Sequence, residues 1–120
     1  MKGKPMRVSG SCHCGNIAFE AEGDFSTAME CNCSICRRKG MLLAFVPRTE
    51  MQLKTPRENL SAYKFNKHVI THYFCANCGV APFSEATAPN GLEMSAINLR
   101  CVPEIDLSAL KVTQYDGAAA

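Results

Sequence analysis

Short apolar segments separated by turn residues recur along this chain, and where apolar and polar positions alternate, the period of two is typical of strands that bury one face. From 17 to 22 every odd position is apolar and the even positions are Ala or Glu, which predicts a strand. Gly23-Asp24 supplies a turn, and residues 25–30 can return as a second strand. We expect these two strands to form a hairpin.

The rest of the chain contains further short strand patterns separated by turns. Residues 41–46 form a compact apolar run that suits a buried strand, and 51–55 is a less regular candidate. Two more pairs of strands are predicted on either side of turn-forming residues. They are 61–65 with 69–74, around Asn66-Lys67, and 80–84 with 92–99, around a loop that contains Pro89-Asn90-Gly91.

Helix is scarce in this pattern. Ser34 can cap a short helical turn that ends at Gly40 and carries basic residues at its C-terminal side. Residues 106–110 predict another single turn. The predicted fold class is therefore mainly β, in several hairpins, with little helix.

Length and composition narrow the class of protein. The 120 residues fit one domain over 1–120, and 47% hydrophobic residues is an ordinary fraction for a globular protein. This composition excludes disordered, collagen-like and coiled-coil proteins. We expect residues 118–120, which are all alanine, to form a frayed tail.

The abnormal number in the composition is eight cysteines. Thiols at this density form either a disulfide framework or metal sites, and the cellular compartment usually decides between them. The N-terminus lacks the apolar stretch of a signal peptide, and the longest apolar run, 41–46, is too short to span a membrane. We therefore predict a cytoplasmic protein, with no membrane partner, whose thiols are reduced and bind metal.

Charge changes this picture little, because 13 Lys and Arg against 11 Asp and Glu give a net charge of +2. The one basic cluster, Arg37-Arg38-Lys39, contains too few charges to predict nucleic-acid binding, and we interpret it as a solvated helix end. No nucleic-acid partner is expected.

The positions of the cysteines carry more information than their number. Cys12 and Cys14 precede the first predicted strand, and a group within 31–36 follows the second. Cys75 and Cys78 follow a later predicted strand with two residues between them, and a glycine comes next. This is the spacing of a zinc knuckle, in which two thiolates chelate one ion and the glycine allows a tight turn.

Seven of the eight cysteines divide naturally into a set of four and a set of three. Zinc takes four ligands in a closed structural site, whereas a catalytic site has three protein ligands and an open fourth position. The spacing also allows Cys31 and Cys33 to join Cys75 and Cys78. The division into four and three ligands would then remain, but different cysteines would form the structural and the open site. The natural division places Cys12, Cys14, Cys75 and Cys78 in the set of four and Cys31, Cys33 and Cys36 in the set of three.

The remaining candidate residues are interpreted as structural. His13 lies between two proposed ligands, so we expect its ring to point away from the metal. His68 and His72 are predicted to be sheet residues, and Cys101 a small buried hydrophobe. Asp116 is interpreted as part of an Asp-Gly turn, with a general base near the site as the alternative.

Three ordered motifs make the chain recognisable. Together with the endings at 106–110 and 115–117, they resemble the glutathione-dependent formaldehyde-activating enzyme family, zinc proteins similar to centromere protein V and S-hydroxymethylglutathione synthase. The resemblance covers about residues 7–117. The motifs are Gly10-Ser11-Cys12-His13-Cys14-Gly15, Cys31-Asn32-Cys33-Ser34-Ile35-Cys36 and Phe74-Cys75-Ala76-Asn77-Cys78-Gly79.

The resemblance implies a β-tent fold of small antiparallel sheets organised around zinc. The activity it implies is the condensation of formaldehyde with glutathione, formally a carbon–sulfur lyase reaction. It also implies a structural zinc on Cys12, Cys14, Cys75 and Cys78 and a second, labile zinc on Cys31, Cys33 and Cys36.

We hypothesise that the set of three, Cys31, Cys33 and Cys36, is catalytic. It would bind a small thiol such as glutathione for adduct formation or cleavage with an aldehyde. One alternative is a non-catalytic zinc-stabilised binding module, in which a histidine or Cys101 completes the second site. A nucleic-acid-binding zinc protein is a further alternative, against which the modest charge argues.

Overall fold

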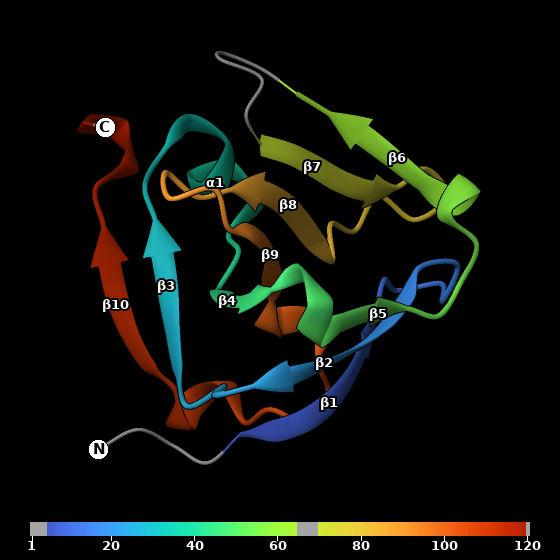
Figure 1. Ribbon diagram of the computed structural model, residues 1–120, viewed down its shortest axis with the longest axis horizontal. Coiled ribbons are helices and arrows are strands. Elements are labelled where there is room, and N and C mark those ends of the chain that lie inside the picture. Colours follow the sequence, from blue (N-terminus) through green and yellow to red (C-terminus); the bar gives the residue numbers. More distant parts are fainter. Residues whose placement is uncertain (1–4, 65–69, 120) are drawn as a thin grey trace.

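The computed structural model describes residues 5–64 and 70–119, and within these ranges the chain is mostly β. Figure 1 shows a small sheet at the bottom of the view and a larger, curved sheet that runs from β10 at the left to β6 at the upper right. The described residues contain one α-helix, α1 (Ser34–Lys39), at the upper end of β3. The small sheet has the order β1 (Met6–Ser11), β2 (Ala18–Gly23) and β5 (Met51–Leu53).

The larger sheet has seven strands, and neighbouring strands in both sheets are antiparallel with one exception. The exception is the pair β3 and β10, which run in parallel from Thr27 opposite Lys111 to Cys31 opposite Tyr115. The order is β10 (Lys111–Tyr115), β3 (Thr27–Cys31), β4 (Leu43–Pro47), β9 (Glu93–Asn98), β8 (Phe83–Thr87), β7 (Ile70–Cys75) and β6 (Leu60–Tyr63).

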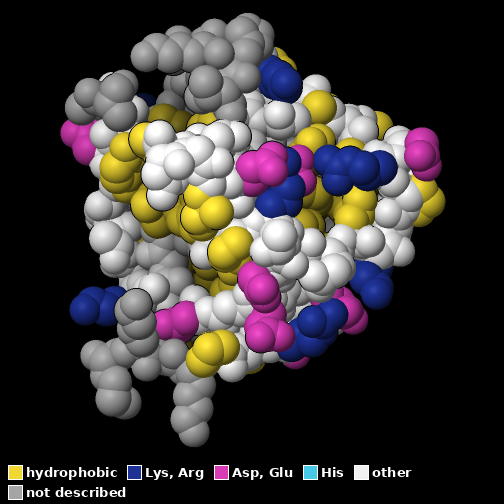
Figure 2. Space-filling model, in the orientation of Figure 1, with side chains coloured by type: hydrophobic (Ala, Val, Ile, Leu, Met, Phe, Trp, Pro, Cys, Tyr) yellow, Lys and Arg dark blue, Asp and Glu magenta, His cyan; other side chains and the backbone are white. Residues whose placement is uncertain are grey.

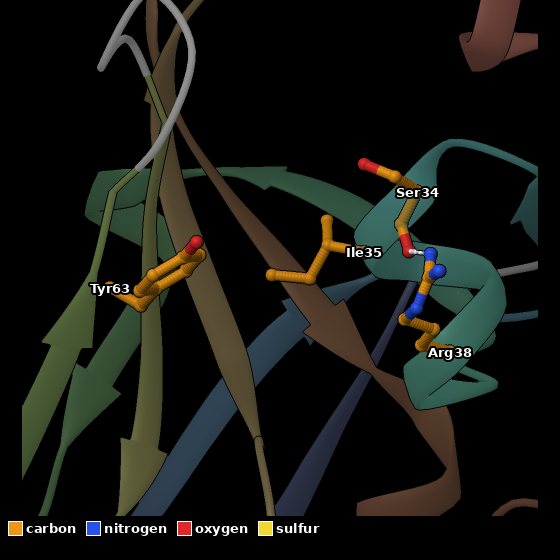
Figure 3. Close-up of a pocket in the computed structure, with 4 residues that line it drawn as sticks. All are labelled: Ser34, Ile35, Arg38 and Tyr63. Carbon is orange, nitrogen blue, oxygen red and sulfur yellow. Dashed lines mark hydrogen bonds between the residues drawn. The ribbon is translucent and has the colours of Figure 1, made fainter.

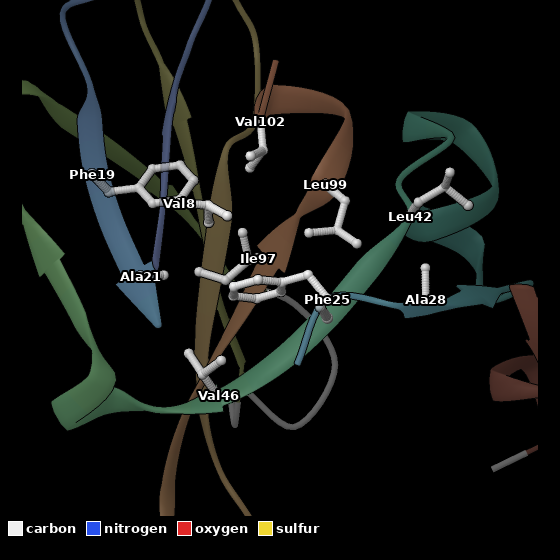
Figure 4. Packing of buried hydrophobic residues seen from close by; sticks show 11 residues of the cluster. Val8, Phe19, Ala21, Phe25, Ala28, Leu42, Val46, Ile97, Leu99 and Val102 are labelled. Atoms are coloured by element: carbon white, nitrogen blue, oxygen red, sulfur yellow. The ribbon is translucent and has the colours of Figure 1, made fainter. Parts of the chain in front are cut away.

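A core of buried side chains holds the two sheets together (Figure 4). Val8, Phe19 and Ala21 come from the small sheet, and Val46 and Ile97 come from β4 and β9 of the larger one. None of these five is more than 3% exposed. Since burying one large apolar side chain contributes about 1.5–3 kcal/mol, this core is a main source of stability.

The predicted hairpin between 17–22 and 25–30 is wrong, although both strands exist. β2 pairs with β1 and β5, whereas β3 lies in the other sheet beside β4 and β10. The physical reason is Phe25, which is 3% exposed and packs in the core between the sheets, so the chain crosses from one sheet to the other here. Asp24 Oδ1 accepts the backbone N–H of Ser26 and closes the bend.

Two strands have no counterpart in the predicted set. In β1 the only large apolar side chain that is buried is Val8, since the other buried position is Gly10. In β10 every residue is exposed, because the strand lies at the edge of its sheet. Neither strand therefore shows the alternation, the compact apolar run or the hairpin turn from which the others were predicted.

The other predicted strands are confirmed with shifted ends. β4, β8 and β9 correspond to the patterns at 41–46, 80–84 and 92–99, and Gly91 turns the loop between the last two with a φ of 87°. β6 and β7 pair in antiparallel fashion as predicted, while their Asn66-Lys67 turn lies outside the described residues.

Short helical turns connect several strands. The predicted turn near the C-terminus is confirmed as a 3-10 helix over Leu107–Ala109, and Asp106 caps it by accepting the backbone N–H of Ser108. No helix within the described ranges is long and apolar enough to cross a membrane. The other 3-10 turns are Arg48–Glu50, Arg57–Asn59, Leu99–Cys101 and Gly117–Ala119.

Two smaller apolar clusters lie beside the cysteines. One contains Cys12 and Cys75, and the other contains Cys36. Each group of cysteines therefore packs against an apolar cluster of its own. The other buried members are Ile17 and Phe83 in the first cluster and Met41, Leu43 and Ala96 in the second.

Candidate metal centres and the adjoining cavity

The ends of β1 and β7 bring four cysteines together. Cys12 and Cys14 follow β1, Cys75 ends β7, and Cys78 comes three residues later. Their sulfurs lie within 4.8 Å of one another, with 3.6 Å between the Sγ atoms of Cys14 and Cys75. We call these four residues the tetrathiol cluster.

Two similar turns shape the tetrathiol cluster. The backbone N–H of Gly15 donates to the carbonyl of Cys12 (3.3 Å), and that of Gly79 donates to the carbonyl of Cys75 (2.8 Å). Both glycines have a positive φ, 86° and 82°, which residues with a side chain rarely adopt. Each glycine thus lets the chain turn back directly after a cysteine motif.

Backbone N–H groups point at the sulfurs of this cluster. Ile17 donates to Cys12 Sγ (3.3 Å), and the backbone N–H of Val80 lowers the pKa of the Cys78 thiol to about 6. Burial raises the pKa of Cys12, which is 2% exposed. A cation held by the four sulfurs would favour their ionised forms, and four converging thiols supported by N–H donors fit the ligand set of a structural zinc.

A second group of cysteines forms at the junction of β3 and α1. Cys31 ends β3, Cys33 is the N-cap of α1, and Cys36 lies one turn further along the helix. Their sulfurs also lie within 4.8 Å of one another, and no histidine, cysteine or carboxylate of the described residues joins them as a fourth. We call these three residues the trithiol cluster.

The cap of α1 lies one residue earlier than predicted, because Cys33 takes the place expected for Ser34. Cys33 Sγ accepts the backbone N–H of Cys36 (3.4 Å), as a serine oxygen does at other N-caps. Gly40 ends the helix as predicted, with a φ of 65°. The hydrogen bond that begins the helix therefore also positions one of the three sulfurs.

The thiols of the trithiol cluster differ in acidity. Burial disfavours ionisation of Cys33, but hydrogen bonds from the backbone N–H groups of Cys36 and Ile35 and from the neighbouring thiols together outweigh it and lower the pKa of the Cys33 thiol. Burial and the neighbouring Cys33 raise the pKa of Cys36. Cys33 thus carries negative charge more readily than Cys36, and a cation bound by all three sulfurs would favour their ionised forms.

Asn32 ties the C-terminal segment across the trithiol cluster. Its backbone N–H donates to the carbonyl of Tyr115 (3.2 Å), and its side chain donates to Asp116 Oδ1 (3.0 Å) and accepts the backbone N–H of Ala118 (2.9 Å). Gly117 lies between these contacts, so close to Cys31 that a Cβ would overlap Cys31 Sγ. Asp116 is therefore held beside the site by Asn32, a residue that sequence reasoning did not single out.

An apolar cavity of about 170 Å³ opens beside the trithiol cluster. Side chains alternate across a strand, so Ala44 and Ile97 point into the main core while Leu43, Phe45 and Ala96 point into the cavity. The cavity thus occupies the face of the larger sheet that lies opposite the small sheet. Within the described ranges no Lys, Arg, Asp or Glu lines it.

Apolar side chains extend from this cavity to the surface. Figure 2 shows hydrophobic side chains gathered over β3, β4 and β8. Phe45, Ile70 and Tyr115, which line the cavity, are 48%, 38% and 47% exposed. Large apolar side chains at the edge of a cavity are a common feature of ligand-binding sites.

A shallower cleft of about 260 Å³ shares Ile35 with the cavity (Figure 3). Ile35 points from α1 toward Tyr63 of β6, and Arg38 lies one turn further along the helix. Arg38 Nη1 donates to the carbonyl of Ser34 (2.7 Å), which fixes the guanidinium at this cleft. A cation is therefore available close to the trithiol cluster but outside the apolar cavity.

The remaining candidate residues that the structure describes lie outside both clusters. His13 is exposed, and Cys101 lies in a 3-10 turn where burial raises its pKa to about 11. His72 is buried in β7 as predicted for a sheet residue, but it also lines the cavity, which no sequence pattern indicated. His68 lies outside the described residues.

Comparison with known proteins agrees with this geometry. A family model described as glutathione-dependent formaldehyde-activating enzyme matches residues 7–113. The chain belongs to this family. A solved crystal structure of a Rhodobacter sphaeroides protein is similar to it with a TM-score of 0.76 and 27% sequence identity, over 88% of this chain and 100% of that chain. The resemblance seen in the three cysteine motifs is thereby confirmed.

Membership of the glutathione-dependent formaldehyde-activating enzyme family gives the two clusters a chemical context. Both groups of thiols could hold metal ions. The one alternative grouping that the spacing allowed, with Cys31 and Cys33 beside Cys75 and Cys78, does not occur in the structure. The family name also associates the fold with a thiol and an aldehyde as reactants.

Proposed function

We propose that this protein binds zinc at both clusters and uses the trithiol cluster to join a small thiol to an aldehyde. Four thiolates close a structural zinc site, whereas three leave a position open for chemistry. The observation that carries the proposal is the different setting of the two clusters. All three cysteines of the trithiol cluster line a cavity, while Cys12 and Cys75 of the tetrathiol cluster are no more than 2% exposed.

The reaction we propose is a reversible addition, with glutathione as the thiol. When bound, zinc lowers the pKa of a thiol and polarises a carbonyl oxygen. Sulfur forms a bond to the carbonyl carbon, the π pair of C=O moves onto oxygen, and oxygen takes up one proton for the one that the thiol loses. The reverse step breaks the C–S bond, which makes the enzyme a carbon–sulfur lyase.

The protein's own groups support this chemistry in three ways. Cys31, Cys33 and Cys36 would hold the ion, and the backbone N–H of Cys33 donates to Cys31 Sγ (3.4 Å) and thus supports its charge. Asn32 keeps the C-terminal segment over the cluster. The apolar walls of the cavity limit the access of water to the reacting atoms.

Positive charge beside the site suits an anionic thiol. Three thiolates and one divalent zinc carry a net charge of −1, and Arg37 and Arg38 on α1 offset it. The guanidinium of Arg38 at the shallow cleft can bind a carboxylate through two parallel hydrogen bonds. We propose that a carboxylate of glutathione lies in this cleft.

The metal content of the purified protein tests the proposal. We expect two zinc ions per chain and acceleration of the exchange between glutathione and formaldehyde, measured by NMR exchange spectroscopy. Cys33→Ala should lose one zinc and the acceleration while the protein still unfolds cooperatively. Cys101→Ala, a cysteine outside both clusters, is the matched control and should change neither quantity.

Three outcomes would contradict the proposal. A Cys33→Ala variant that retains both metal and activity would remove the trithiol cluster from the mechanism. Two zinc ions in a protein that accelerates no exchange would favour a non-catalytic zinc module with the same fold. Disulfides in place of metal would overturn both functions.

A further inference from the structure

We infer that the aldehyde taken by this site carries an uncharged apolar group of about the size of a benzene ring. This inference rests on the proposed thiol–aldehyde chemistry and adds the substrate class to it. The first observation is the size of the cavity. It measures about 170 Å³, whereas a dry protein cavity of about 150 Å³ already binds benzene. Formaldehyde, with two heavy atoms, would leave most of this space unused.

The second observation is the chemistry of the walls. The apolar walls include Met29, Leu43, Phe45, Ala86 and Ala96, and no charged side chain of the described residues lines the cavity. Burial also lowers the pKa of His72, which favours its neutral imidazole. Placing a carboxylate or an ammonium group here would cost its full desolvation. The charged ends of glutathione therefore belong outside, and an apolar group belongs inside.

The third observation is the arrangement along the cavity. The three sulfurs line one part of the wall, and Phe45 and Ile70 reach the surface with 48% and 38% of their area exposed. An aldehyde with its carbonyl at the sulfurs and its apolar group among these side chains would bury them. Apolar pockets with a few polar groups at one point are the usual form of small-molecule sites.

The chemical step then follows the proposed addition with a larger aldehyde. The sulfur of the thiol bonds to the carbonyl carbon, the C=O π bond breaks, and the thiol proton is balanced by one proton gained at oxygen. The product is a hemithioacetal whose apolar group lies in the cavity and whose thiol-derived part extends toward Ile35, which the cavity shares with the shallow cleft.

Two probes test the inference on the zinc-loaded, full-length protein. Benzyl alcohol has the size of benzaldehyde but no carbonyl, so its binding, followed by amide chemical shifts, reports on the cavity without any reaction. Benzaldehyde and formaldehyde are then compared as partners for glutathione by exchange spectroscopy. We expect benzyl alcohol to shift amides of β4 and β8 and benzaldehyde to have the lower KM.

The same substitution, made once in the cavity and once at an exposed position, tests whether the size of the cavity determines binding. Ala86→Leu narrows the cavity and should raise the KM for benzaldehyde and the Kd for benzyl alcohol about tenfold or more, with a clearly smaller effect on the formaldehyde reaction. Ala62→Leu makes the same change at an exposed position of β6 and should alter nothing. If Ala86→Leu does not fold, Phe45→Ala at the half-exposed edge of the cavity is the second variant. It should also raise the KM for benzaldehyde and the Kd for benzyl alcohol.

The outcomes separate this inference from the proposed function. Acceleration with formaldehyde but no binding of benzyl alcohol at the cavity would overturn the inference and leave the proposed function standing. Binding of benzyl alcohol at the cavity without acceleration of either aldehyde would overturn the proposed function and support an apolar ligand. An equal effect of Ala86→Leu on both aldehydes would also overturn the inference.

Discussion

Gly117 lies against the trithiol cluster with no side chain to separate it from the sulfurs. A Cβ at this position would overlap Cys31 Sγ and lie 3.2 Å from the Cβ of Cys33. We predict that Gly117→Ala displaces the segment or the sulfur and lowers zinc affinity at this cluster by about tenfold or more. Competition with a chromogenic chelator measures this, and the zinc held by the tetrathiol cluster is the internal control. Unchanged affinity at both clusters would show that the segment can move aside at no cost.

At the residue scale the cysteine motifs could be predicted from the sequence, because neighbouring thiols of one cluster lie close together along the chain. Cys33 and Cys36 are three residues apart, and so are Cys75 and Cys78. The hydrogen bond between Asn32 and Asp116 could not be predicted in this way, because the two residues are 84 positions apart in the sequence. Such contacts depend on which strands become neighbours, and no local pattern encodes that.

At the scale of elements, Glu85 connects β8 to its surroundings through charge. It is buried on β8, accepts the hydroxyl of Tyr73 on β7 (2.8 Å) and Nη2 of Arg57 (3.2 Å), and lies 3.7 Å from Nε of Arg48. That Nε is buried and has no hydrogen bond. The carboxylate therefore compensates two cations that come from separate 3-10 turns.

We predict that Glu85→Ala lowers the free energy of unfolding by about 2 kcal/mol, less than for a fully buried pair because Arg57 is 58% exposed. Glu93→Ala is the matched control. Glu93 also pairs with Arg48 (2.7 Å) but is 61% exposed, so its loss should cost about 0.5 kcal/mol or less. Urea unfolding measures both, and equal losses would contradict a special role for Glu85.

The predicted strands show where a local pattern succeeds and where it fails. The runs that became β4 and β9 lie in the middle of the large sheet and are buried over most of their length, so the apolar run at 41–46 and the turn residues before 92–99 were enough to find them. The pairing of β2 and β3 was mispredicted because a turn signal at 23–24 also fits a crossing between sheets. Only the burial of Phe25 distinguishes the two, and burial is a property of the assembled core.

At the scale of the whole molecule, the tetrathiol cluster joins the two sheets at one point. Cys12 follows β1 of the small sheet, and Cys75 ends β7 of the large one. The spacing of the cysteines left open which motif would join Cys75 and Cys78. The meeting of these two strand ends decides it, and that meeting is a consequence of the long-range fold.

We predict that the two clusters lose their zinc under different conditions and with different effects on stability. A mild chelator should remove one zinc with little change in melting temperature, because the trithiol cluster opens onto a cavity. Removal of the second should abolish cooperative unfolding, since a structural zinc contributes on the order of 10 kcal/mol. Zinc content and near-ultraviolet circular dichroism, followed together, measure this. Loss of both ions from a protein that remains folded would contradict it.

The parallel pairing of β10 with β3 has a consequence for the order in which the protein matures. All four thiols of the tetrathiol cluster have been made once synthesis reaches Cys78. The parallel neighbour of β3, β10, is made only with residues 111–115, and Asn32 acquires its last partner at Ala118. A nascent chain can therefore assemble the tetrathiol cluster before the C-terminal segment covers the trithiol cluster, so the trithiol cluster is completed last.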